Sequence, residues 1–215
     1  MNEHGPRPPG FQAGAVVRIP PDRVPEAIDV LCDAFHDYPV MRFILRDSGP
    51  DFERHHRALS GLFVTARALR GDPILVVEEE GRAVAAATIT PPGDREMPPE
   101  FAERRDALWR EIGPGAKERY ERLGEVWKAF AIPEPQYHLN MIGVRRSHHG
   151  RGLARPLLDA VHEMSRVDPA SIGVSLTTEL PRNVTLYEHF GYRIVGHTRV
   201  DDALETWGFF RDDPA

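Results

Sequence analysis

The chain has 215 residues, of which 41% are hydrophobic and 28% charged, with a formal net charge of −6 and one cysteine. These values are ordinary for one globular domain, and they exclude an internal disulfide, a bilayer-spanning segment of about 20 apolar residues and a basic surface suited to nucleic acid. We therefore expect a cytoplasmic protein that binds neither membranes nor nucleic acid.

The first segments predict a lead-in, a strand and a helix. Residues 1–13 are rich in proline and glycine without the apolar stretch of a signal peptide, so we expect a disordered lead-in. The β-branched run 15–19 predicts a strand that ends at Pro20. A helix is then expected from about Asp22, because apolar residues recur at helical spacing up to Phe35. We expect Cys32, inside this helix, to be a small buried core residue rather than a nucleophile.

Residues 51–90 predict a second amphipathic helix followed by a hairpin. The helix spans about 51–70 and ends at Gly71. Strands are expected at 74–78 and 82–90, and the acidic triplet 78–80 with Gly81 forms the turn between them. We interpret this triplet as a solvated turn rather than a metal site.

Residues 91–135 interrupt this alternation. Prolines flank the segment on both sides, and two helical patterns lie between them, at about 100–112 and 115–130. We interpret the segment as a helical insertion, which either adds packing or forms one wall of a substrate pocket.

Strands and helices alternate from residue 136 to the end. We expect strands at 137–144, 172–176, 192–200 and 206–211, and helices at about 151–166 and 182–189. The predicted class is therefore α/β (α+β): a mixed sheet covered by helices, built as a single domain from residues 14–212.

A glycine-rich turn stands between the strand 137–144 and the following helix. Gly150 and Gly152 allow backbone N–H groups to turn toward one point, and a helix N-terminus adds unpaired N–H groups and positive dipole charge. Such a turn suits a phosphate or pyrophosphate, to which Arg151 adds a formal charge. The turn matches neither a P-loop nor a dinucleotide fingerprint, whose third small residue is replaced by Arg155.

This turn and its helix resemble the acetyl-CoA signature of the GNAT acyltransferases. The matching pattern runs Val144-x5-Gly150-x-Gly152-x-Ala154-x2-Leu157-Leu158. The core of the signature, [Q/R]-x-x-G-x-[G/A], falls on His149, Gly152 and Ala154, so a histidine stands where the family has Gln or Arg. A second departure is Pro156, which lacks an N–H and could distort the first helical turn.

A second motif supports the same family. Residues 181–192 resemble its later pattern N-x3-[F/Y]-Y-x2-x-G-[F/Y], at Asn183, Tyr187, Gly191 and Tyr192. The two motifs occur in the expected order, and residues 137–211 look most like the puromycin-type aminonucleoside acetyltransferases. The resemblance implies the GNAT acyl-CoA N-acyltransferase fold, with a central mixed, mostly antiparallel sheet flanked by helices.

The resemblance also implies a function and a set of site residues. The function is transfer of an acetyl group from acetyl-CoA, without a metal, to a primary amine of a small molecule by direct attack. Tyr187 would protonate the leaving thiolate, although a tyrosine on a short helix can also simply pack. The implied cofactor-binding residues are Ile142, Gly143, Val144, His149, Gly150, Arg151, Gly152, Leu153, Ala154 and Asn183, of which Asn183 could instead be a helix N-cap.

Several alternatives stay open from the sequence. The chain could be a protein lysine or N-terminal acetyltransferase, or a non-catalytic acyl-CoA-binding module, and it could act as a monomer or a homodimer. The general base could be Glu179, Glu134 or His138, or a chain of water molecules. The adjacent pairs His55-His56 and His148-His149 do not share a helix face and have no cysteine partner, which argues against zinc.

Overall fold

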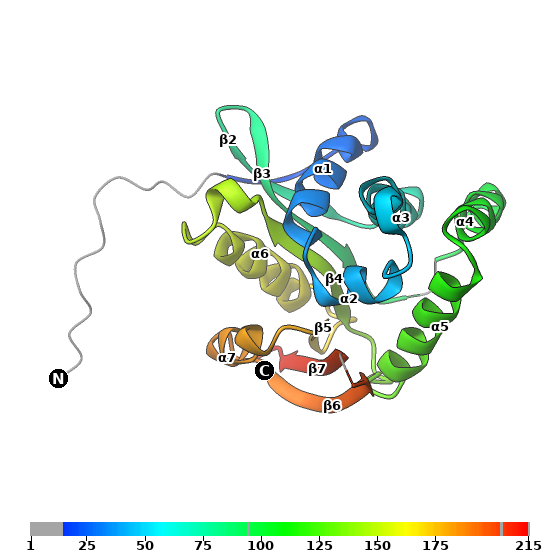
Figure 1. Ribbon diagram of the computed structural model, residues 1–215. Helices are drawn as coiled ribbons and strands as arrows, with labels where there is room; N and C mark the ends of the chain where they lie inside the picture. Colours follow the sequence, from blue (N-terminus) through cyan, green and yellow to red (C-terminus); the bar gives the residue numbers. More distant parts are fainter. Residues whose placement is uncertain (1–14, 94, 203, 215) are drawn as a thin grey trace.

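The computed structural model describes residues 15–93, 95–202 and 204–214, so the predicted lead-in 1–13 lies outside the described residues (Figure 1). The strands are β1 (Val16–Arg18), β2 (Ile74–Glu79), β3 (Arg82–Thr90), β4 (Tyr137–Val144), β5 (Gly173–Thr178), β6 (Arg193–Asp201) and β7 (Leu204–Asp212). The α-helices are α1 (Val24–Phe35), α2 (Pro39–Ile44), α3 (Phe52–Leu69), α4 (Pro99–Ile112), α5 (Pro114–Lys128), α6 (Ala154–Val167) and α7 (Pro181–His189). Short 3-10 turns lie at η1 (Pro21–Arg23), η2 (Gly49–Asp51) and η3 (Arg146–His148).

The strands form one mixed sheet in the order β1-β2-β3-β4-β5-β7-β6. Every neighbouring pair is antiparallel except β4 and β5, which are parallel. Parallel neighbours need a crossover connection, and α6 provides it between these two strands. The mixed, mostly antiparallel sheet predicted from the sequence is therefore present.

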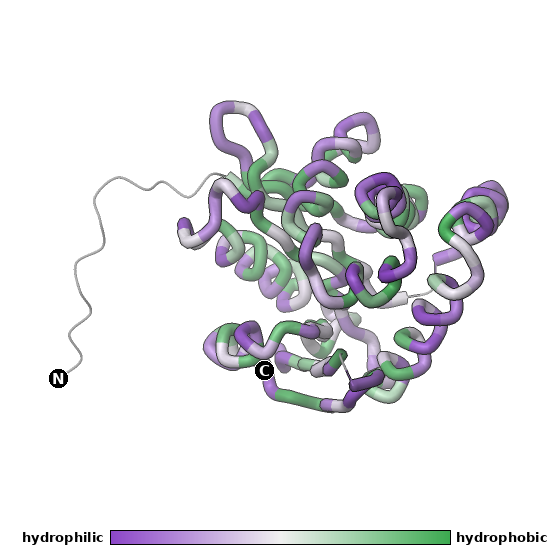
Figure 2. The backbone as a smooth tube through the Cα atoms, in the orientation of Figure 1, coloured by the Kyte–Doolittle hydropathy of each residue, from purple (hydrophilic) through white to green (hydrophobic). Residues whose placement is uncertain are grey.

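Helices cover both faces of the sheet, and each face has its own apolar core. In β2, Ile74 and Val76 pack into the core under α1, α2 and α3, whereas Leu75 and Val77 pack into the core shared with α6 and α7. Successive side chains of a strand point to opposite faces, so a strand that is covered on both sides must be apolar throughout. Figure 2 shows this as hydrophobic strands between helices whose outer faces are hydrophilic.

One helix was not predicted. In α2, four of the six residues are buried, namely Val40, Met41, Phe43 and Ile44. A short helix that is buried on most sides shows no apolar–polar period, so its sequence carries no helical signal.

In α1, Cys32 is half-buried rather than fully buried, and burial raises the pKa of its thiol, which disfavours the thiolate.

The two helices expected within 91–135 are present as α4 and α5. Helix α4 packs on α3, while α5 contacts α2 and β6. The end of this segment is fixed by the ring of Phe130, which occupies the space beside Gly196 and Gly208; a Cβ atom on Gly208 would lie 2.7 Å from Phe130 Cβ. The segment is thus attached to the C-terminal hairpin by direct packing.

Candidate active site

The sheet opens between β4 and β5. The two strands pair only from Tyr137 opposite Val174 to Leu139 opposite Leu176, although β4 continues to Val144. Residues 140–144 therefore have β3 on one side and no strand on the side facing β5. An unpaired strand edge presents backbone N–H and C=O groups to a ligand.

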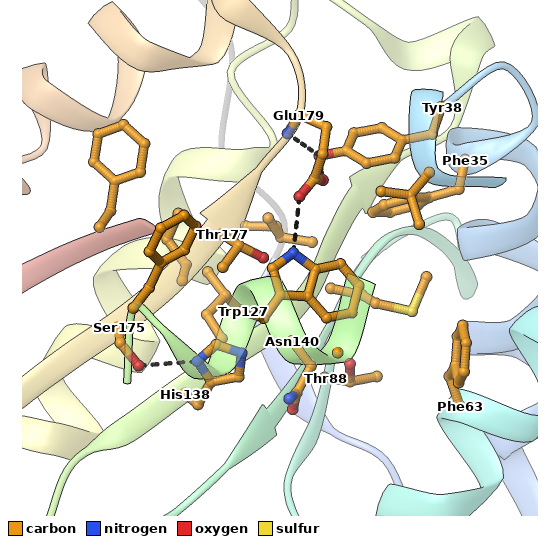
Figure 3. A pocket seen from close by; sticks show the side chains of 18 of the residues that line it. Phe35, Tyr38, Phe63, Thr88, Trp127, His138, Asn140, Ser175, Thr177 and Glu179 are labelled. Carbon is orange, nitrogen blue, oxygen red and sulfur yellow. Dashed lines mark hydrogen bonds between the residues drawn. The ribbon is translucent and has the colours of Figure 1, made fainter. Parts of the chain in front are cut away.

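A cavity of about 520 Å³ lies at this opening (Figure 3). Its walls come from segments far apart in the chain: Phe35 and Tyr38 from the α1–α2 region, Phe63 from α3, Trp127 from α5 and Tyr187 from α7. Since α5 belongs to the segment 91–135, the structure supports the interpretation of that segment as one wall of a pocket.

A buried carboxylate stands on the cavity wall. Glu179 is 5% exposed, and its Oε1 accepts hydrogen bonds from Thr206 Oγ1 at 2.7 Å and Trp127 Nε1 at 3.3 Å. Its Oε2 accepts from the Tyr38 hydroxyl at 3.0 Å, and Figure 3 shows Tyr38 and Trp127 on either side of Glu179. Burial raises the pKa of Glu179, while these three donors stabilise the ionised form and work against that rise.

Tyr187 lies beside this cluster on α7. The side chain is 6% exposed, its ring packs on Tyr192 and Phe209, and it lines the cavity. Within the described part of the chain its hydroxyl has no hydrogen-bond partner, which leaves it available to a ligand. Burial, together with the nearby Glu179 charge, raises the pKa of Tyr187 above its ordinary value, so the hydroxyl keeps its proton at neutral pH.

The glycine turn before α6 has open space at both of its glycines. Gly150 and Gly152 adopt left-handed φ angles of 76° and 73°, and the space where a Cβ atom would stand is open at both. Helix α6 begins at Ala154 rather than near 151, and no side chain caps its N-terminus. Pro156 is the third residue of α6, where an N–H would have no partner inside the helix, so this departure from the family pattern costs no hydrogen bond.

The side chains of His149 and Arg151, both in this turn, already have partners. His149 Nε2 lies 3.0 Å from the Val144 carbonyl, and because a carbonyl only accepts, Nε2 carries the hydrogen. Because the Nε2 hydrogen is donated to Val144, only Nδ1 of His149 remains for a ligand. Arg151 is paired with Glu79 at 2.8 Å.

The other predicted cofactor-binding residues lie at the end of β4, just before α6 and in the first turn of α7. Ile142 lines the cavity, and Gly143 lies so close to α1 that a Cβ atom would meet Ala34 Cβ at 2.6 Å. Val144 packs with the α6 core, as does the buried Leu153, so a ligand would meet their backbones. Asn183 lines the cavity, but the N-cap of α7 is Leu180, so the N-cap interpretation of Asn183 is wrong; its Nδ2 donates to Thr178 Oγ1 at 3.0 Å.

The base candidates differ in position. Glu179 and His138 line the cavity, whereas Glu134 is exposed and lies outside the lining. His138 Nδ1 is 2.9 Å from Ser175 Oγ.

In the described residues no three His, Cys, Asp or Glu side chains gather as a metal-binding group, and no helix there is long and apolar enough to cross a membrane.

We expect the folded protein to lose stability as the pH falls from about 6.5 to about 4. Burial lowers the pKa of His138 from 6.5 to about 4. Between these two pH values the His138 side chain is protonated in the unfolded chain but neutral in the folded chain, so protonation favours unfolding. Urea unfolding across this range should show a smaller loss for His138→Asn, which keeps a polar atom near Ser175. His189→Asn, at an exposed position, is the control. If the free energy of unfolding of His138→Asn falls with pH as steeply as that of wild type, the prediction is wrong.

The sequence did not reveal three cavity residues. Tyr38, Arg67 and Trp127 belong to no motif, and their partners lie 52 to 141 residues away in the chain. Only the aromatic content of α5 gave a signal, and only for Trp127.

A model of the "Acetyltransferase (GNAT) domain" matches residues 114–207. Among solved structures, a protein from Corynebacterium glutamicum described as histone acetyltransferase HPA2 and related acetyltransferase superposes with a TM-score of 0.69 at 20% identity, covering 95% of this chain and 98% of that chain. The polyamine N-acetyltransferase of Drosophila melanogaster, which forms N-acetylagmatine, gives 0.61 at 19% identity over 91% and 97%. The ribosomal-protein-S18-alanine N-acetyltransferase of Escherichia coli gives 0.51 at 12% over 94% and 94%. The predicted GNAT fold is confirmed.

Proposed function

We propose that this chain, an acetyl-transferring enzyme with the GNAT fold, transfers an acetyl group from acetyl-CoA to a primary amine of a small molecule. One observation carries the proposal: the cavity at the β4–β5 opening has Tyr187 on its wall, and β4 leads from it directly into the glycine turn and α6. A cofactor with an extended arm and a pyrophosphate matches this arrangement, because the open strand edge can pair with the arm and the glycine turn that follows can bind the pyrophosphate.

The residues present fit acetyl-CoA. We propose that the backbone of Ile142–Val144 holds the pantetheine arm and that N–H groups of 149–154 hold the pyrophosphate, with Asn183 beside the arm. When bound, acetyl-CoA supplies a thioester carbonyl, so the amine nitrogen forms the new C–N bond as the C–S bond breaks. A backbone N–H of β4 would stabilise the oxyanion, and the Tyr187 hydroxyl would deliver a proton to the departing sulfur.

Glu179 is our choice for the general base, acting directly or through water. A base must be unprotonated near neutral pH and face the amine. His138 is neutral at pH 7, but its pKa of about 4 makes it a weak proton acceptor. Glu134 is exposed outside the cavity, whereas Glu179 combines a position on the wall with a raised pKa.

The wall formed by α5 supports a small acceptor rather than a protein chain. Tyr120, Trp127 and Lys128 of α5 line the cavity, and we propose that this helix leaves room for a small amine but not for a polypeptide. The resemblance to puromycin-type enzymes over residues 137–211 makes an amine on an aromatic body the first acceptor to test. We further propose the cytoplasm as the site of action, because the lone cysteine requires no oxidising compartment.

We expect acetyl-CoA to raise the melting temperature and to release free thiol only when an accepted amine is present. A ligand that binds the folded state alone stabilises it by mass action, and direct attack requires both substrates bound together. The measurement is a melting curve with acetyl-CoA or CoA, followed by an amine screen read by thiol release. Melting curves unmoved by both ligands would refute acetyl-CoA binding, and a shift without turnover on any amine would favour the non-catalytic module.

A further inference from the structure

Arg67 is a second charged residue of the cavity lining, in addition to Glu179. Arg67, in the last turns of α3, lines the cavity. Its Nε donates to Asn140 Oδ1 at 2.9 Å, and the same oxygen accepts a hydrogen bond from Thr90 Oγ1 at 2.9 Å. Because Asn140 is a neutral amide, this contact orients the guanidinium without neutralising its charge (Asn140 is labelled in Figure 3).

Within the described part of the chain, no carboxylate lies within 4.0 Å of the Arg67 guanidinium. Asp72 lies near enough to interact with its charge, but the oxygens of Asp72 are paired with Arg70 at 3.0 Å and Arg95 at 3.4 Å. Burial and the neighbouring Arg70 both disfavour the positive charge and lower the pKa of Arg67. A desolvated charge of this kind is costly unless a counter-ion joins it.

The other cavity groups leave this charge uncompensated. His138 is neutral at pH 7, and Glu179 directs both oxygens to hydrogen-bond donors of the protein. The wall between is aromatic, formed by Phe63, Tyr120 and Trp127. The cavity therefore combines an aromatic wall with the half-buried guanidinium of Arg67, whose two terminal nitrogens make no hydrogen bond within the described residues.

We propose that Arg67 binds a carboxylate of the acceptor, so that the substrate is an amine that also bears a carboxylate on an apolar or aromatic body. A guanidinium is planar and donates two parallel hydrogen bonds to a carboxylate, which makes it selective for this group. The same cation repels a second ammonium, so diamines are disfavoured. The inference rests on the proposed acetyl transfer and adds the class of acceptor.

The test uses three acceptors of one shape and different charge: 4-(aminomethyl)benzoate, benzylamine and p-xylylenediamine, with ω-amino carboxylates of increasing length as a flexible series. We expect kcat/KM to be about 10- to 100-fold higher for the carboxylate than for benzylamine, the usual range for a hydrogen bond to a charged group, and lowest for the diamine. Arg67→Gln should remove this preference. Asn140→Asp, which is isosteric and gives Arg67 an internal counter-ion, should reverse it toward the diamine.

Two controls separate the possible failures. Lys128 is a second, largely exposed cation of the cavity lining, and Lys128→Gln should keep the wild-type order of acceptors. Calorimetry with 4-methylbenzoate, which has no amine, should show binding to the CoA-loaded wild type and at least about tenfold weaker binding to Arg67→Gln. Equal rates for the three amines, or a preference lost in Lys128→Gln instead, would overturn the role of Arg67 while acetyl transfer stands. Absence of turnover on every amine would count against the proposed function, and the 4-methylbenzoate titration would still decide about Arg67.

Discussion

We expect Tyr187→Phe to lower kcat by about 10²–10⁴, the range for loss of a general acid, with little change in the affinity for acetyl-CoA. The substitution removes one O–H and keeps the ring that packs on Tyr192 and Phe209. The hydroxyl has no hydrogen-bond partner within the described residues, so its loss leaves no protein group unsatisfied. The measurement is steady-state turnover of a working amine across pH, with acetyl-CoA titrated into both proteins.

Tyr192→Phe is the matched control for this prediction. Tyr192 is also a buried tyrosine, but its hydroxyl lies 3.0 Å from His162 Nε2 and outside the cavity lining. We expect this variant to lose stability and to retain turnover. Near-identical turnover of Tyr187→Phe and wild type at every pH would remove Tyr187 from the mechanism.

The raised pKa of Tyr187 refines its expected role. An ordinary tyrosine near pKa 10 and a thiol near 8.5 exchange a proton with little free-energy change. Because burial disfavours the tyrosinate, the proton here stays on oxygen until negative charge develops on the sulfur. We therefore propose that the hydroxyl acts first as a hydrogen-bond donor to the developing thiolate.

We expect Gly152→Asp to weaken acetyl-CoA binding by about 10²-fold, or about 2.8 kcal/mol. The left-handed φ of 73° is strained for any residue with a Cβ atom, and the new carboxylate would occupy the open space in which we place the pyrophosphate. Calorimetric titration with acetyl-CoA measures the effect directly.

Gly49→Asp supplies the control for strain and charge. Gly49 also has a positive φ, of 50°, and open space around its Cβ position, but it lies outside the turn that precedes α6. We expect this variant to lose stability and to bind acetyl-CoA like wild type. Equal affinity of Gly152→Asp and wild type would mean that the glycines only make a turn.

The fold was predictable where side-chain periodicity is strong. The α6 stripe of Leu157 and Val161 is buried as expected, and the alternation in β4 matches its observed burial. Helix boundaries were less accurate, as at α6, because the left-handed Gly152 delays the start of the helix. Helix α2 escaped prediction because burial on most sides removes the pattern.

The site was predictable only in part, since motifs record local geometry. The glycine turn and Tyr187 lie within short motifs, and the structure places the tyrosine on a cavity wall. The hydrogen bonds of Glu179 join residues brought together only by the complete fold, with Tyr38 lying 141 positions away. Arg67 lies in α3, and its sequence pattern predicts that the charged residues of this helix face solvent. The neighbouring sequence therefore does not distinguish Arg67 from Arg57 or Arg70.

The ring of Phe130 has a consequence for the order in which the molecule is completed. It fills the space left by Gly196 and Gly208, which lie on the last two strands, β6 and β7. The segment that carries Trp127 can therefore reach its final packing only after β6 and β7 have been synthesised. On the function proposed above, the glycine turn and α6 would form before the α5 wall of the acceptor pocket, so a nascent chain would hold acetyl-CoA before it can acetylate an amine.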